Sequence, residues 1–257
     1  MPWYELLAIA AAGVAAGTIN AVVGSGTLIT FPSLLAFGFP PVTANVSNNL
    51  GLVPGGVSGT WGYRRELVGQ SPLVRRLVPM SLAGSIAGAL LLLWLPAEAF
   101  HAIVPVLLAV SVVLVVVQPR LQRRMKQRLE QPDRRPSRRH SPVLLGGTFG
   151  AGAYGGYFGA AQGVLLMGLL GSLVPESLQR LNAVKNVLSF VANSVAAVVF
   201  LVVAREHINL TAVALLAVGS LTGGALGARY GRRLPPRVLR AVIVVVGVVA
   251  IVKVATS

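Results

Sequence analysis

The sequence predicts an all-α, polytopic integral membrane protein built from two inverted repeats of about five membrane helices each. Three observations predict this fold. Apolar residues make up 54% of the 257 residues and charged residues only 11%, which is more apolar surface than a soluble domain can bury. The second half of the chain repeats motifs of the first half. The arginines of the two halves lie at opposite ends of matching apolar segments, which predicts the inversion.

Two motifs carry the internal repeat. The segment G-S-I-A-G-A from Gly84 returns as G-S-L-T-G-G from Gly219, and L-P-A-E-A-F-H-A from Leu95 returns as L-P-P-R-V-L-R-A from Leu234. In the first copy, arginines precede the segment with G-S-x-x-G, at Arg64, Arg65, Arg75 and Arg76. In the second copy they follow it, at Arg229, Arg232, Arg233 and Arg237. Because lysine and arginine stay cytoplasmic, the copies cross in opposite directions, which is typical of secondary transporters.

Hydropathy predicts eight long membrane segments and two short ones. The long segments of the first copy are 4–22, 42–62, 77–95 and 100–118. Those of the second copy are 143–158, 181–204, 210–229 and 238–256. The short segments, 25–38 and 160–173, each follow a glycine-rich break. Fourteen helical residues reach only about 21 Å, less than the hydrocarbon thickness of about 30 Å, so each is a half-span, a broken helix or a tilted span.

The short segments decide the topology. If they do not cross, each half has four crossings and both copies point the same way. If they cross, each half has five and the copies are inverted. The arginine pattern favours ten membrane segments with both termini outside, and eight crossings is the rival interpretation. The predicted units are a first repeat (1–118), a basic cytoplasmic linker (119–141) and a second repeat (142–257).

The net charge of +15 follows from this topology. Nine of the 22 lysines and arginines lie in 120–139, where the linker is predicted, and most of the others lie in loops on the same side. A charge bias of this kind is typical of membrane orientation. We therefore expect the lipid bilayer, and not nucleic acid, as the partner of the chain.

Polar residues gather at equivalent places in the two copies. In the first they are Asn45, Asn48 and Asn49, on one helix face. In the second a polar stripe runs through Asn182, Lys185, Asn186, Ser189 and Asn193. Lone membrane asparagines usually make interhelical hydrogen bonds of about 0.6 kcal/mol. An ammonium at mid-membrane costs about 2.5 to 3.5 kcal/mol and usually faces a cavity or ligand, so the repeated clusters predict a binding site. The alternative is that Lys185 snorkels to the cytoplasmic surface.

The glycine-rich breaks supply the complementary half of the predicted site. Gly24, Ser25, Gly26 and Thr27 correspond to Gly159, Ala160, Ala161 and Gln162. A helix that begins in mid-membrane presents free N–H groups and a positive dipole end, which together bind anions. The alternative is that the glycines only allow close helix packing. The predicted substrate-binding residues are Gly24, Ser25, Gly26, Thr27, Asn45, Asn48, Asn49, Gly159, Gln162, Asn182, Lys185, Asn186 and Asn193.

Several kinds of chemistry have no support in the sequence. There is no cysteine, and the seven carboxylates lie at segment ends or in loops. No G-x-x-x-x-G-K-[ST] motif for ATP phosphates occurs. We therefore predict no catalytic residue, no metal site, no cofactor and no enzyme activity. A membrane-embedded enzyme and a non-transporting accessory subunit are the rival classes.

Two groups of motifs resemble a known family. They are G-x-I-N-A-V-V-G-S-G-T-L-I-T-F-P-S-L-L from Gly17 with P-P-V-x-A-N-x-x-N from Pro40, and G-x-x-G-G-Y-F-G-A-x-Q-G from Gly152 with L-N-A-V-K-N from Leu181. They resemble the sulfite exporter TauE/SafE family of bacterial membrane proteins. The resemblance implies a plasma (inner) membrane permease for small anions such as sulfite or sulfonates.

Together with the embedded lysine, the resemblance predicts a secondary transporter that exports a small sulfur-containing anion by alternating access. The alternatives within the transporter class are a permease for another small solute or for a cation. The sequence leaves the coupling ion and the oligomeric state open.

Overall fold

The computed structural model describes residues 1–129, 141–231, 241–249 and 251. In the first half the helices are α1 (Trp3–Val22), α2 (Thr27–Ala36), α3 (Pro41–Gly62), α4 (Ser71–Trp94) and α5 (Ala97–Leu129). In the second half they are α6 (Ser141–Tyr157), α7 (Gln162–Leu173), α8 (Leu178–Val203), the short 3-10 turn η2 (Arg205–His207) and α9 (Leu210–Tyr230). Residues 241–249 are also helical. The all-α prediction is confirmed for the described part of the chain.

The two halves follow the same order of long and short helices. α2 has 10 residues and α7 has 12, so they reach only about 15 and 18 Å. Gly24 and Gly159, which precede them, have φ of 90° and 78°, a conformation that glycine adopts without steric cost. The predicted short segments are therefore real helices, and each begins at a glycine turn.

Five described helices are long and apolar enough to cross a membrane: α1, α4, α5, α8 and α9. α3, with 22 residues, is also long enough, but its asparagines and glycines make it less apolar. α5 continues past the predicted end at residue 118, because residues 119–129 are mostly good helix formers such as Arg, Gln, Lys and Leu. The rest of the predicted linker, 130–140, and most of the predicted last span lie outside the described residues.

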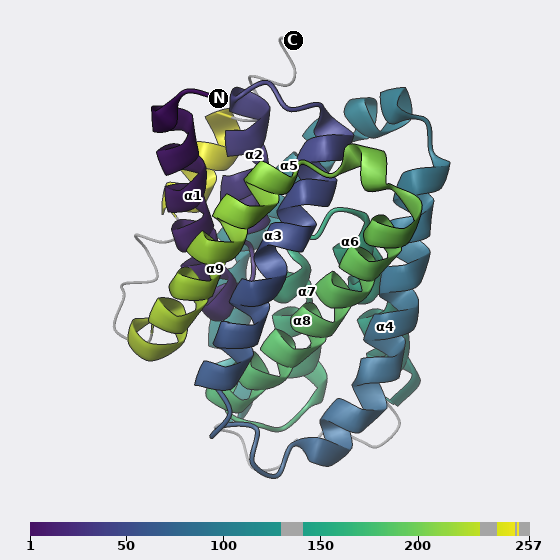
Figure 1. Ribbon diagram of the computed structural model, residues 1–257. Helices are drawn as coiled ribbons and strands as arrows, with labels where there is room; N and C mark the ends of the chain where they lie inside the picture. The colour runs from purple at the N-terminus through teal and green to yellow at the C-terminus, as the bar shows by residue number, and fades with distance from the viewer. Residues whose placement is uncertain (130–140, 232–240, 250, 252–257) are drawn as a thin grey trace.

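Close packing of small residues joins the two halves. Figure 1 shows α1 beside α9 on one side of the bundle, α4 on the other side, and α3 and α8 between them. A Cβ on Gly223 of α9 would collide with the Val14 carbonyl oxygen of α1, and a Cβ on Gly88 of α4 with that of Ala153 on α6. The small size of these two glycines brings the backbones of the paired helices together.

The register of these contacts gives the helix directions. Gly13 and Gly17 of α1 face Gly219 and Gly224 of α9 in the same order, so α1 and α9 run parallel. Gly51 and Gly55 of α3 face Leu216 and Ser220 of α9, again in order. By the same argument Gly84 and Gly88 of α4 pair in order with Phe149 and Ala153 of α6. Short connections at 63–70 and 204–209 reverse the chain, so α1, α3 and α9 run one way and α4, α6 and α8 the other.

Candidate functional site

The two glycine breaks meet at the centre of the bundle. The N–H of Gly163, in the first turn of α7, donates to the carbonyl oxygen of Gly24 at 3.1 Å. A Cβ on Gly24 would lie 2.5 Å from the Gly163 Cα, which leaves no room for a side chain. Nearby, Phe31 of α2 packs edge to face on Phe158, with ring centroids 5.1 Å apart. The N-terminal ends of α2 and α7 therefore lie side by side at the interface between the halves.

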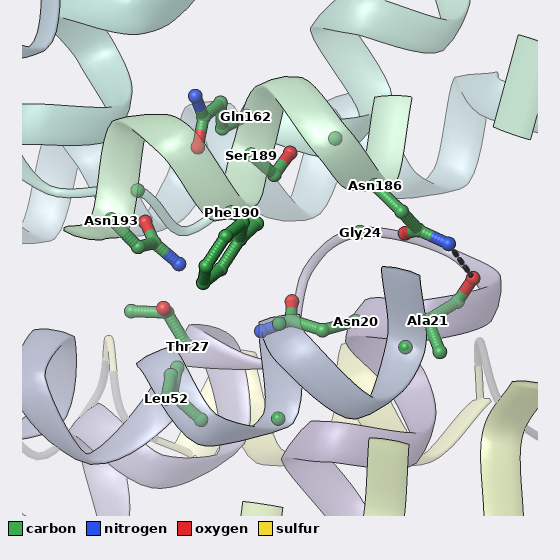
Figure 2. Close-up of a pocket in the computed structure, with 15 residues that line it drawn as sticks. Asn20, Ala21, Gly24, Thr27, Leu52, Gln162, Asn186, Ser189, Phe190 and Asn193 are labelled. Atoms are coloured by element: carbon green, nitrogen blue, oxygen red, sulfur yellow. Dashed lines mark hydrogen bonds between the residues drawn. The ribbon is translucent and has the colours of Figure 1, made fainter. Parts of the chain in front are cut away.

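A small cavity of about 30 Å³ opens at this junction. Figure 2 shows it between the end of α1, the start of α2 and the middle of α3 on one side and α8 on the other, with Thr27, Phe190 and Asn193 pointing toward one another. Six predicted site residues line it: Gly24, Thr27, Gly159, Gln162, Asn186 and Asn193. Nine further residues complete the lining: Asn20, Ala21, Leu52, Gly55, Gly56, Gly59, Gly163, Ser189 and Phe190. The cavity is thus shared by both halves of the chain.

Hydrogen-bond donors in this cavity are left without protein partners. Gln162 is only 3% exposed, yet its Nε2 has no hydrogen-bond partner in the described residues, and the same holds for the buried Oγ of Ser189. Thr27 Oγ1 accepts from Asn48 Nδ2 at 3.2 Å, which leaves its own O–H free to donate. A buried polar group without a partner is costly, so these groups are suited to a polar ligand.

Helix polarity at the cavity is positive on the side of the short helices. The backbone N–H of Thr27, the first residue of α2, makes no hydrogen bond within the described chain. Each helix N-terminus carries the equivalent of about half a positive charge. Among the described residues, the lining contains no Asp, Glu, Lys or Arg. The described inner surface is therefore formed by neutral donors and helix ends.

The polar stripe of α8 contacts the C-terminal end of α1. Lys185 Nζ donates to the carbonyl oxygen of Asn20 at 3.0 Å, and Asn182 and Asn186 donate to that of Ala21 at 3.1 and 3.3 Å. Lys185 has no exposed surface, so it does not snorkel. No described carboxylate lies within ion-pair distance of its ammonium. Asn186 lines the cavity, whereas Asn182 and Lys185 contact the end of α1 outside the lining.

The asparagines of the first half have a related arrangement at the other break. Asn45 Nδ2 donates to the Tyr157 carbonyl at the end of α6, at 2.9 Å. Asn48 lies between Thr27 and Thr30 and is hydrogen bonded to both. Asn49 is 8% exposed, and its Oδ1 has no partner among the described residues. None of the three asparagines lines the cavity. Ser25 and Gly26 lie in the first break, also outside the lining.

Asn20 is the main polar residue that the sequence analysis missed. Its Oδ1 accepts from the N–H of Gly26 at 2.6 Å, which fixes the turn between α1 and α2. The equivalent position in the second half is Gly155, and the Gln162 side chain lies where a Cβ of residue 155 would be. A single asparagine in an apolar segment, four residues before a glycine break, is the sequence signal that identifies it.

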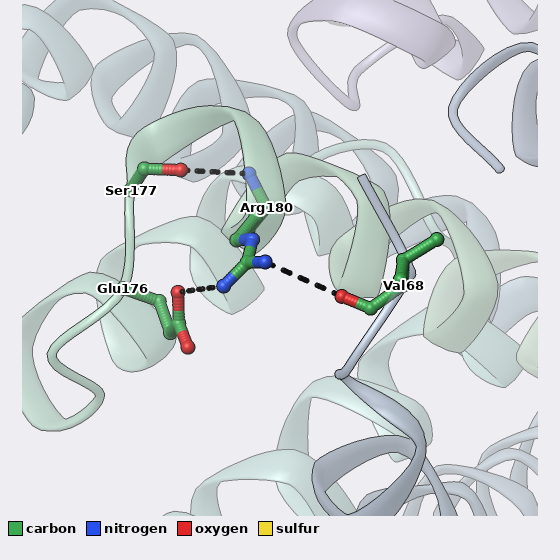
Figure 3. Close-up of polar contacts among 4 residues, drawn as sticks. All are labelled: Val68, Glu176, Ser177 and Arg180. Carbon is green, nitrogen blue, oxygen red and sulfur yellow. Dashed lines mark hydrogen bonds and ion pairs between the residues drawn. The ribbon is translucent and has the colours of Figure 1, made fainter. Parts of the chain in front are cut away.

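A polar contact joins the two halves at the start of α8. Figure 3 shows Arg180 between the Glu176 carboxylate, at 3.1 Å, and the Val68 carbonyl, at 3.4 Å. The Ser177 side chain caps α8 by accepting from the Arg180 N–H. A hydrogen bond from Gln70, together with Arg180, lowers the pKa of the Glu176 carboxyl. The contact ties the connection between α3 and α4 to the start of α8.

Apolar spans, half-length helices and a small polar cavity between two halves define a multi-pass membrane protein of the transporter class. The model of the family described as "Sulfite exporter TauE/SafE" matches residues 9–254. The chain belongs to the TauE/SafE family.

Named relatives agree with this assignment. "Probable membrane transporter protein YfcA" of Escherichia coli K12 is 28% identical over 91% of this chain and 83% of its own length. "Probable membrane transporter protein ORF9" of a Sinorhizobium species is 27% identical over 91% and 85%, and a "Probable membrane transporter protein" of Haemophilus influenzae is 26% identical over 88% and 85%. No solved structure matches the chain. The chain is therefore a membrane transporter.

Proposed function

We propose that this transporter exports a small sulfur-containing anion, such as sulfite or an organosulfonate, across the bacterial inner membrane, and that the cavity is its substrate site. The observation that carries this proposal is the junction of two half-helix N-termini with the buried, unpartnered amide of Gln162. Backbone N–H groups and helix dipoles at such ends favour anions. The family description supports the sulfur-containing class.

The chemistry of the cavity supports a small oxyanion. A volume of about 30 Å³ equals the share of a single water in the liquid, so the cavity must widen to admit sulfite, and must widen further for a sulfonate. Amide and hydroxyl groups from Thr27, Gln162, Ser189 and Asn193 converge on it. An oxyanion offers several acceptors to donors of this kind.

We further propose that the halves form an inverted repeat, with 119–141 on the cytoplasmic side and both termini outside. The helix directions support the inversion, because α1 and α3 run opposite to their counterparts α6 and α8. The exchanged arginine positions support it independently. In such transporters one half rocks against the other around a fixed central site, and here the contact between Gly24 and Gly163 lies at that centre.

Outward flux of an anion needs no buried carboxylate. The inside-negative membrane potential favours anion exit by about 2.3 kcal/mol per charge per 100 mV. This agrees with a cavity whose lining carries no acidic side chain. The potential itself is sufficient as a driving force in this proposal.

Sulfite efflux from proteoliposomes tests the proposal. Under an imposed potential we expect wild-type protein to release labelled sulfite, and Gln162→Ala to release it at least about tenfold more slowly, because hydrogen bonds to charged groups contribute about 1.5 to 3 kcal/mol. The matched control is Ser172→Ala on the same helix, where the hydroxyl donates only to the Gly168 carbonyl. We expect this variant to match wild type.

Two results would contradict the proposal. If the wild-type protein transports neither sulfite nor any sulfonate, the proposed export function is wrong. If Gln162→Ala releases sulfite at the wild-type rate, the cavity is not the substrate site.

A further inference from the structure

A broken helix places ends of opposite polarity at one site. The cavity touches the N-terminal side of α2 through Thr27, and it also touches the last turn of α1 through Asn20 and Ala21. The final carbonyl groups of a helix have no partners within the helix and carry the equivalent of about half a negative charge. An anion in the cavity therefore meets one attractive and one repulsive helix end.

Donors from other elements cover the repulsive end of α1. The carbonyl oxygens of Asn20, Ala21, Val23 and Gly24 each accept a hydrogen bond from α7, α8 or α5. The donors that the described residues supply to three of these four carbonyls are neutral. The carbonyl of Asn20 receives the ammonium of Lys185, at 3.0 Å.

We propose that Lys185 sets the preference of this transporter for anions without touching the substrate, by masking the negative end of α1. This inference rests on the proposed function. Lys185 is fully buried and has no carboxylate partner among the described residues, so the end of α1 is the group that opposes its charge. Low dielectric surroundings transmit such a charge over longer distances than water does. The cavity then senses mainly the positive ends of α2 and α7.

The second break, between α6 and α7, has no lysine at the corresponding helix end among the described residues, and so shows a helix end that is capped by a neutral group. There the last carbonyl of α6, that of Tyr157, accepts the neutral amide of Asn45 and no other donor from the described part of the chain. If both breaks were capped by neutral groups, two helix N-termini and two C-termini would surround the cavity with nearly cancelling charges. A single buried ammonium on one side removes this cancellation. Lys185 is therefore a positioning and specificity residue and not a ligand.

The test compares an anion with its uncharged isostere. Methanesulfonate and dimethyl sulfone have similar shape but differ in charge, and each is used to compete with labelled sulfite efflux from proteoliposomes. We expect wild-type protein to prefer methanesulfonate, and Lys185→Gln, which keeps a donor for the Asn20 carbonyl, to reduce that preference about tenfold. Lys185→Arg keeps the charge and should retain the preference. Gln118→Ala, which removes the neutral donor to the Val23 carbonyl, is the matched control and should also retain it.

Loss of a remote charge, as in Lys185→Gln, and loss of a direct ligand, as in Gln162→Ala, should weaken inhibition by anions in different ways. We expect Lys185→Gln to weaken inhibition by sulfite-sized and larger sulfonates by one common factor, whereas Gln162→Ala should weaken it by factors that depend on anion shape.

Three outcomes overturn the inference. The first is an unchanged preference in Lys185→Gln, and the second is a shape-dependent loss in that variant. The third is loss of the preference for methanesulfonate in a folded Lys185→Arg protein. This outcome tests the inference even if Lys185→Gln does not fold. Each leaves the proposed function in place, whereas a wild-type protein without anion flux overturns that function itself.

Discussion

The two glycine breaks of this transporter share a backbone path but differ in the groups that surround it. Each consists of a long helix, a glycine with positive φ and a short helix. The end of α1 accepts donors from Lys185, Asn182 and Asn186, whereas the Tyr157 carbonyl at the end of α6 accepts the amide of Asn45. The two breaks thus share the turn, but among the described residues a charged side chain contacts only the first.

The shared turn is a requirement of the fold, whereas the lysine that contacts only one of the two described breaks is, in our proposal, a requirement of selectivity. The position that aligns with Lys185 in the first half is Ser47. Its Oγ accepts the N–H of Asn209 at 2.9 Å and takes no part in the central junction. Both breaks contribute to the lining of the cavity, through Gly24 and Thr27 in the first and Gly159 and Gln162 in the second, whereas Lys185 contacts the first break alone among the described residues.

The largest effect expected in this comparison comes from adding a methyl group at each glycine turn. Gly24→Ala combines a left-handed backbone, which costs about 1 to 3 kcal/mol, with a contact of 2.5 Å to the Gly163 Cα, which adds about 1 to 3 kcal/mol of overpacking. In Gly159→Ala the nearest atom outside the turn's neighbours, the Gly155 oxygen, is 3.2 Å away, so backbone strain dominates.

Thermal unfolding in detergent, followed by tryptophan fluorescence, measures the difference between the two variants. We expect Gly24→Ala to lose about twice as much free energy of unfolding as Gly159→Ala, with wild type as the common reference. Equal losses would show that the contact between Gly24 and Gly163 is loose in solution.

A smaller effect is expected from removing the amide caps. In Asn45→Ala the buried Tyr157 carbonyl loses its donor, which costs about 1 to 3 kcal/mol. In Asn182→Ala the Ala21 carbonyl keeps the donor from Asn186 at 3.3 Å, so the loss should stay below about 1 kcal/mol. Chemical denaturation of the two variants in the same detergent compares them. A larger loss for Asn182→Ala would mean that Asn186 does not hold the end of α1 alone.

Much of the fold follows from the sequence, because hydropathy and glycine positions act locally. The short helices α2 and α7 were predicted from segment length, and the turns before them from Gly24 and Gly159. The contacts of Lys185 were not predictable in the same way. They depend on the register between α1 and α8, two helices far apart in the sequence, and hydropathy does not specify that register. Asn20 was missed because its role depends on the turn that it stabilises.

The smallest expected effect concerns the contacts at the ends of α3 and α8. Arg180, Glu176 and Val68 join the halves at the start of α8, whereas Ser47 and Asn209 make a neutral contact near the start of α3. A hydrogen bond from Gln70 and the charge of Arg180 lower the Glu176 pKa in the folded state. The stabilisation is therefore present above the unfolded pKa, near 4.3 for a free Glu, and is lost as the pH falls through the folded value.

Acid sensitivity measures this contact. Because Arg180 is 43% exposed and Glu176 29%, its contribution should be only about 0.2 to 1 kcal/mol. The difference in free energy of unfolding between wild type and Glu176→Gln should stay constant from pH 7 down to the unfolded pKa, about 4.3, and shrink below it as the pH falls through the lower folded value. The control Ser47→Ala removes a contact without titratable groups, so its difference from wild type should not vary with pH. A pH-independent difference for Glu176→Gln would show that the carboxylate charge does not stabilise this junction, and that only the neutral hydrogen bonds hold the two halves together there.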